Sequence, residues 1–123
     1  ISLKEIVIPS TVTKIGENAF KGCEALEEVI FNEGLTEIGG SAFRGCAALK
    51  EISIPEGVTS IGGYIFESCS NLDLVLALPT SLQSVGEGAF RGCKTNRKIL
   101  ISFIFRYIFI ERVIWHNMLY FFR

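Results

Sequence analysis

The cysteines of this 123-residue chain recur at a nearly fixed interval, and this periodicity constrains its fold more than any other feature. The spacings are 23, 23 and 24 residues, and a phenylalanine stands three residues before each cysteine. The two series are Phe20, Phe43, Phe66, Phe90 and Cys23, Cys46, Cys69, Cys93. A period of this length is typical of stacked structural units.

Four units follow from this period, covering residues 1–23, 24–46, 47–69 and 70–93. The shared pattern, written from Leu3 onward, is L-x-x-I-x-I-P-x-x-V-x-x-I-G-x-x-A-F-x-G-C-x-x. The fourth unit carries one additional residue, which we place within 73–78, upstream of Pro79. One unit cannot bury its apolar side chains alone, whereas stacked units bury a continuous core. The sequence therefore predicts a repeat solenoid.

Each unit is expected to contain short parallel β segments. Residues 6–8 and their copies alternate as strands do, and proline ends most of them because it cannot donate to a ladder. A second extended piece is expected at 12–15, and Gly16 and its copies are expected to allow a turn. Residues 19–23 suit a single helical or 3₁₀ turn.

The unit resembles the leucine-rich repeat of BspA-like surface proteins in its I-P, V-x-x-I-G and A-F-x-G-C landmarks over residues 1–93. Three residues depart from that pattern: Asn32 replaces the proline, Ile65 the alanine and Ser68 the glycine. The resemblance implies a curved right-handed solenoid with a parallel sheet on one face. It also implies adhesion or protein–protein binding at a microbial cell surface, in a surface or secreted protein, and it supplies no catalytic residue.

The phenylalanine and cysteine columns are expected to form the structural core, because equivalent residues of stacked units lie about 4.8 Å apart. Two other interpretations of the cysteines remain open. A metal site needs ligands that converge on one point, and a disulfide needs a specific torsion between the side chains. A row with this spacing favours buried free thiols that pack as small hydrophobic groups.

Charged residues on the exposed side of the strands are the candidate binding site. One column alternates in sign and is expected to pair along the stack, and the next stacks like charges: Lys4, Glu27, Lys50, Asp73 and Glu5, Glu28, Glu51. Stacked glutamates cost stability, which suggests an acidic stripe for a basic partner or a cation. The alternative is a solvated face that repels wrong partners. Lys21, Arg44 and Arg91 form a basic edge, interrupted by Glu67, that is expected to serve solubility.

Catalytic and cofactor-binding patterns are missing from the sequence. The repeats hold no histidine, so no Ser-His or Cys-His pair can form there, and the single His116 makes no metal site. A formal net charge of −1 gives no reason to expect nucleic acid as a partner. We therefore expect no enzyme activity, no metal and no cofactor.

The last 30 residues differ in kind from the repeats. They hold 8 of the 14 aromatic residues, none of the 12 glycines, and a net charge of +5 against −6 for residues 1–93. The solenoid is expected to continue over a partial unit at 94–102, with a fifth strand at 99–101. Residues 103–123 form an aromatic, basic tail with three competing interpretations. It is a transmembrane helix, an amphipathic helix that caps the solenoid or lies on an anionic membrane, or a segment translated past a splice site or frameshift.

Three hypotheses for function follow. The first is a non-catalytic interaction or adhesion module, with a protein ligand that the sequence does not identify. The second is a membrane-associated protein anchored by its tail, and the third is a truncated product without independent function. Because the chain starts at Ile1, without a signal peptide, we expect a fragment of a longer protein. The sequence does not predict the oligomeric state.

Overall fold

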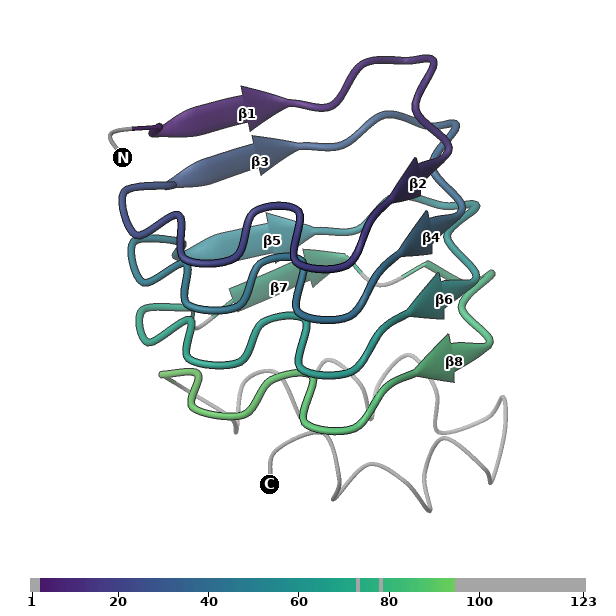
Figure 1. Ribbon diagram of the computed structural model, residues 1–123. Helices are drawn as coiled ribbons and strands as arrows, with labels where there is room; N and C mark the ends of the chain where they lie inside the picture. The colour runs from purple at the N-terminus through teal and green to yellow at the C-terminus, as the bar shows by residue number, and fades with distance from the viewer. Residues whose placement is uncertain (1–2, 73, 78, 95–123) are drawn as a thin grey trace.

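The computed structural model describes residues 3–72, 74–77 and 79–94, where the chain winds into stacked coils (Figure 1). Each coil adds one strand to each of two faces. One face holds β1 (Glu5–Val7), β3 (Glu28–Ile30), β5 (Glu51–Ser53) and β7 (Leu74–Ala77). The other holds β2 (Lys14–Ile15), β4 (Glu37–Ile38), β6 (Ser60–Ile61) and β8 (Ser84–Val85). The predicted repeat solenoid of short parallel strands is confirmed.

The register of the strands follows the sequence period. Ile6 pairs with Val29 and Ile15 with Ile38, 23 residues apart in both cases. In the last pair of the first face the register shifts, because Ile52 faces Val75 while Ser53 faces Ala77. The additional residue of the fourth unit therefore lies within 73–78, as predicted.

The two faces differ in continuity. Strands β2, β4, β6 and β8 form one four-stranded sheet, whereas the first face consists of two separate pairs, β1–β3 and β5–β7. The single parallel sheet implied on one face by the family resemblance is thus interrupted between β3 and β5 on the candidate binding face, while the opposite face is continuous.

The segment before each cysteine is a series of hydrogen-bonded turns, and no helix is present among the described residues. In the first coil, alternate N–H groups donate to the next coil: Asn18 to Gly40 O (3.0 Å), Phe20 to Ala42 O (2.7 Å) and Gly22 to Arg44 O (2.8 Å). The intervening N–H groups donate three residues back, as Cys23 does to Phe20 O (3.2 Å). The expected short turn is therefore present as isolated bonds spanning three residues. These bonds never follow one another into a helix, because every second donor bonds to the neighbouring coil.

Hydrogen bonds between coils run in both directions along the stack. The turn segments donate forward, from one coil to the next, as described above. On the strand faces many donors point backward, as Glu27 N does to Lys4 O (2.8 Å) and Thr36 N to Thr13 O (2.8 Å). Each coil therefore presents both donors and acceptors to each neighbour.

The glycines in the Gly16 column begin the predicted turns, since Ala19 N donates to Gly16 O and Ala42 N to Gly39 O (3.3 Å each), and they also allow close approach between coils. The glycines with positive φ lie elsewhere, for example Gly22 (φ 77°) and Gly45 (φ 76°). A Cβ on Gly39 would lie 2.6 Å from the backbone nitrogen of Glu17, whereas a Cβ on Gly16 would meet nothing within 4 Å. The glycine is therefore needed wherever a preceding coil lies against it.

The phenylalanine column runs through the core as a stack of near-parallel rings. Ring centroids are 5.3 Å apart for Phe20 and Phe43, 5.8 Å for Phe43 and Phe66, and 5.6 Å for Phe66 and Phe90. The last three rings are fully buried, whereas Phe20, in the first coil, is only partly buried. Offset stacking at these distances is favourable for aromatic pairs.

Phe31 is the residue that differs most from its equivalents at the interruption of the first face. It follows β3 at the position that Ile8 and Ile54 occupy in the neighbouring coils, which are 5% and 1% exposed. The Phe31 ring packs edge-on against Phe43, with centroids 5.9 Å apart, and remains partly exposed. A side chain larger than Ile8 and Ile54 therefore lies next to the place where β3 and β5 fail to pair.

Three predictions lie outside the described residues: the partial unit 94–102 beyond Lys94 with its fifth strand, the helix or cap at 103–123, and the place of Asp73. Within the described residues, no helix has the length and apolar character needed to cross a membrane.

Candidate functional site

The predicted binding residues gather on the outer side of the first strand face. Lys4 precedes β1, Glu27 precedes β3 and Lys50 precedes β5, while Glu5, Glu28 and Glu51 are the first residues of those strands. All six side chains are exposed. Glu5 and Glu28 are direct partners in the β1–β3 register, so the stacking of like charges occurs as expected between these two coils.

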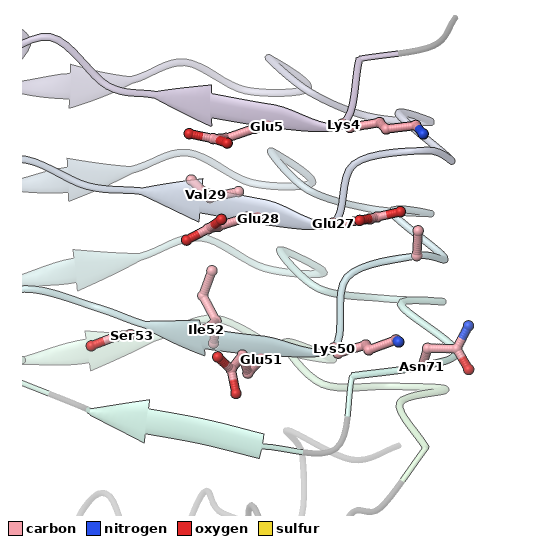
Figure 2. A pocket seen from close by; sticks show the side chains of 11 residues that line it. Lys4, Glu5, Glu27, Glu28, Val29, Lys50, Glu51, Ile52, Ser53 and Asn71 are labelled. Carbon is pink, nitrogen blue, oxygen red and sulfur yellow. The ribbon is translucent and has the colours of Figure 1, made fainter.

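The expected pairing within the alternating column does not occur. No ion pair within 4.0 Å joins Lys4 to Glu27 or Glu27 to Lys50 in the described part of the chain. Figure 2 shows the ammonium ends of Lys4 and Lys50 on one side, and the carboxylates of Glu5, Glu28 and Glu51 on the other. The face therefore keeps its charges separate and accessible.

A hollow of about 810 Å³ opens on this face at the interruption between β3 and β5. It is lined by the six charged residues already named and by Val29, Ala48, Ile52, Ser53 and Asn71 (Figure 2). The lining carries four carboxylates and two ammonium groups, so it is acidic overall. Val29 and Ile52 lie at its base: Val29 is partly buried, and Ile52, which is 2% exposed, belongs to the hydrophobic core.

The backbone hydrogen bonds that join β1 to β3 have no counterparts between β3 and β5, where the hollow lies. Between β1 and β3, Lys4 O accepts from Glu27 N and Glu28 N, and Ile30 O accepts from Ile8 N. The equivalent bonds would join Lys50 N and Glu51 N to Glu27 O, and Phe31 N to Ser53 O. None of these three forms in the described residues. The opposite face of the same two coils stays closed, with Gly62 N bonded to Ile38 O at 2.8 Å.

The sequence reasoning missed the exposed apolar residues beside the glutamates. Val7 is 58% exposed and Ile30 is 42% exposed, and the two are partners in the β1–β3 register. They lie two residues after Glu5 and Glu28, on the same side of the strands. The signal was available, because strand alternation places every second residue outward. The site therefore combines an acidic column with an apolar pair.

The cysteine column lies inside the solenoid and takes no part in this site. All four residues are free thiols, and Cys46, Cys69 and Cys93 are buried. The thiol of Cys69 donates to Phe43 O at 3.1 Å, and the thiols of Cys46 and Cys93 make the equivalent bond in their coils. Burial, followed by the neighbouring Cys23, raises the pKa of Cys46 to about 11, and burial raises the pKa of Cys93 to about 12. Such thiols are poor nucleophiles at neutral pH.

The basic edge on the turn segments is an ion-paired cluster rather than only a solubilising surface. Glu67 is 7% exposed and lies between two arginines, with 2.7 Å from its Oε1 to Arg44 Nη2 and 3.7 Å from its Oε2 to Arg91 Nη1. The two arginines neutralise a carboxylate that burial would otherwise disfavour. The residue that interrupts the basic edge therefore joins three coils.

Comparison with protein families gives one match, described as "BspA type Leucine rich repeat region", in six copies over residues 1–112. The match includes all the described residues and extends beyond residue 102, where we place the end of the solenoid. That boundary stays a prediction.

Several solved structures resemble this chain. A leucine-rich repeat protein of T. pallidum has 27% identity and a TM-score of 0.63, and the pneumococcal vaccine antigen PcpA has 28% and 0.64. A leucine-rich repeat protein from Bacteroides ovatus has 39% identity and a TM-score of 0.52. The matches cover 76%, 73% and 76% of this chain but 57%, 22% and 30% of those proteins. The chain thus spans little more than half of the first relative and less of the others. A search of curated proteins found no match.

Proposed function

This chain belongs to the BspA-type leucine-rich repeat family, and on that premise we propose that it is a non-catalytic protein-binding module of a surface or secreted adhesin. The observation that supports the proposal is the outer strand face, where Val7 and Ile30 are exposed beside Glu5 and Glu28. Exposed apolar residues with charged neighbours are typical of interaction surfaces.

The size of this face sets the expected strength of binding. A stable interface buries about 800 Å² per partner, and four stacked strands span only about 15–20 Å along the axis. A single copy therefore supplies a small contact, and the chain covers only part of each solved relative. We expect the isolated chain to bind weakly and an array of copies to bind through multivalency.

The experiment uses beads coated densely with the full chain and flowed over a panel of immobilised extracellular-matrix proteins. The proposal expects retention of the beads on at least one matrix protein, while the soluble monomer binds it more weakly than about 1 µM. The variant Val7→Glu with Ile30→Glu should abolish retention, and Glu24→Gln, which alters an exposed residue outside the face, should leave it unchanged. Equal retention of the wild-type and double-variant beads on every matrix protein would refute the proposal.

A further inference from the structure

We propose that the hollow between β3 and β5 binds an arginine side chain of the partner protein. The inference rests on the proposed function, because it names the group through which a bound protein contacts this face. It uses three features: backbone acceptors without their usual partners, an excess of carboxylates, and an apolar lining that fits a methylene stem.

The first feature is the interrupted ladder. Glu28 N and Ile30 O bond toward β1, so the backbone of Val29 between them is directed toward β5. In a continuous ladder, Glu27 O would accept from Lys50 N and Glu51 N, and Ser53 O would accept from Phe31 N. Neither carbonyl oxygen makes such a bond among the described residues. The hollow therefore offers carbonyl oxygens to a donor that enters from outside.

The second feature is charge. Four glutamates and two lysines line the hollow, and Figure 2 shows Glu5, Glu28 and Glu51 set apart from the lysine ammonium groups. Within the described part of the chain no cation lies within 4.0 Å of these three carboxylates. A cation that enters on the glutamate side relieves the repulsion between stacked carboxylates.

The third feature distinguishes arginine from other cations. Val29 and Ala48, which are both partly exposed, provide an apolar lining against which an aliphatic stem can lie, while its charged end stays near the carboxylates. A guanidinium carries five donors in a planar fork, so it can bond to a carboxylate and to a carbonyl oxygen together. On its glutamate side the hollow offers acceptors of both kinds, carboxylates and carbonyl oxygens, which favours arginine over a metal ion or lysine.

The test uses the full chain labelled with ¹⁵N and the peptide acetyl-Thr-Val-Arg-Val-Thr-amide as probe. The matched peptide carries citrulline, which keeps the shape of arginine but lacks its charge. We expect the arginine peptide to shift the amide signals of Phe31, Lys50 and Glu51, and the citrulline peptide to bind at least about tenfold more weakly. Equal affinities, or shifts that do not include these three amides, would overturn the proposal.

Paired variants separate the hollow from general acidity. Glu28→Gln with Glu51→Gln removes two carboxylates that line it, and Glu24→Gln with Glu33→Gln removes two exposed carboxylates outside it. The first pair should weaken the arginine peptide by about tenfold or more, and the second by less than about twofold. If both pairs have the same effect, the peptide is attracted by overall charge and the assignment fails. Far-UV circular dichroism checks that both variants remain folded.

The bead assay distinguishes this inference from the proposed function. If retention is lost in Val7→Glu with Ile30→Glu but persists in Glu28→Gln with Glu51→Gln, the partner uses the face without the hollow, and the arginine site is refuted while the function stands. If the peptide shows the expected selectivity but no bead is retained, the arginine site stands while the adhesion function fails.

Discussion

Replacing the same glycine in two coils should give opposite effects on stability. Gly16 and Gly39 occupy equivalent positions, and neither has a positive φ. A Cβ on Gly16 meets nothing within 4 Å, whereas a Cβ on Gly39 would lie 2.6 Å from Glu17 N, 2.8 Å from Gly16 C and 3.0 Å from Ile15 O. Gly16→Ala should therefore stabilise the chain by about 0.4–1 kcal/mol, because alanine reduces the freedom of the unfolded chain.

Gly39→Ala should destabilise the chain because backbone surrounds the new methyl group and cannot rotate away. An ordinary contact requires the two coils to separate by most of an ångström. That separation breaks the bond from Gly39 N to Ile15 O (2.8 Å) and strains the bond from Asn18 N to Gly40 O (3.0 Å). Loss of the first bond, which leaves its N–H and carbonyl groups unpaired, together with weakening of the second costs about 2–4 kcal/mol.

Urea unfolding followed by far-UV circular dichroism measures both variants. A difference of about 2.4–5 kcal/mol between them corresponds to midpoints about 1–5 M apart for usual urea slopes. A wild-type midpoint too low to show the loss can be raised with sucrose or another excluded osmolyte. Equal midpoints for Gly16→Ala and Gly39→Ala would refute the close-approach explanation. They would indicate that these glycines act only within their own coil.

Phe31→Ile should let β3 and β5 pair, and hydrogen exchange of the Phe31, Lys50 and Glu51 amides should slow by about tenfold or more; unchanged exchange would mean that another residue holds the strands apart. Glu67→Gln should lower stability by about 1–3 kcal/mol in urea unfolding, since its carboxylate is buried between Arg44 and Arg91, whereas Glu37→Gln, in an exposed pair with Lys14 (3.4 Å), should change it by less than about 1 kcal/mol. Equal losses would contradict the role of burial. The pKa of a cysteine thiol is 9.0 without burial and about 11 for Cys46 in the folded chain, so the folded state keeps the Cys46 thiol protonated to a higher pH than the unfolded state does. The contribution of the protonated thiol to stability is complete below about pH 9. It falls as the pH rises to 11, by up to about 1.4 kcal/mol per pH unit. Cys46→Ala should therefore reduce the fall of the melting temperature with pH over that range. An unchanged slope would argue against a buried thiol.

Periodicity predicts the architecture of this chain because every coil repeats the same contacts. The register, the additional residue of the fourth unit and the interior place of Phe43 and Cys46 all follow from equivalent positions in neighbouring coils. Local backbone geometry was harder to predict. The turn before each cysteine looks helical in sequence, but its alternate donors bond to another coil, which no single unit reveals.

The candidate site was predictable only in part. Strand alternation indicates which glutamates face outward, and it would have identified Val7 and Ile30 as well. The hollow arises instead where β3 and β5 fail to pair, beside the contact of the Phe31 ring with Phe43, and no spacing in the sequence encodes that interruption. Asn32 shows the same limit: it replaces a proline, and its side chain donates to Pro9 O at 2.6 Å and accepts from Gly34 N at 2.7 Å, so it links two coils that proline could not link.

The opposed directions of the hydrogen bonds between coils have an electrostatic consequence for length. In an α-helix all peptide dipoles point the same way, and the two ends carry opposite partial charges. In this solenoid the turn segments donate forward while strand residues such as Glu27 and Thr36 donate backward, so the peptide dipoles largely cancel along the axis. Adding a coil therefore adds little to the peptide dipole along the axis, so the ends of a longer stack gain no partial charge from the backbone.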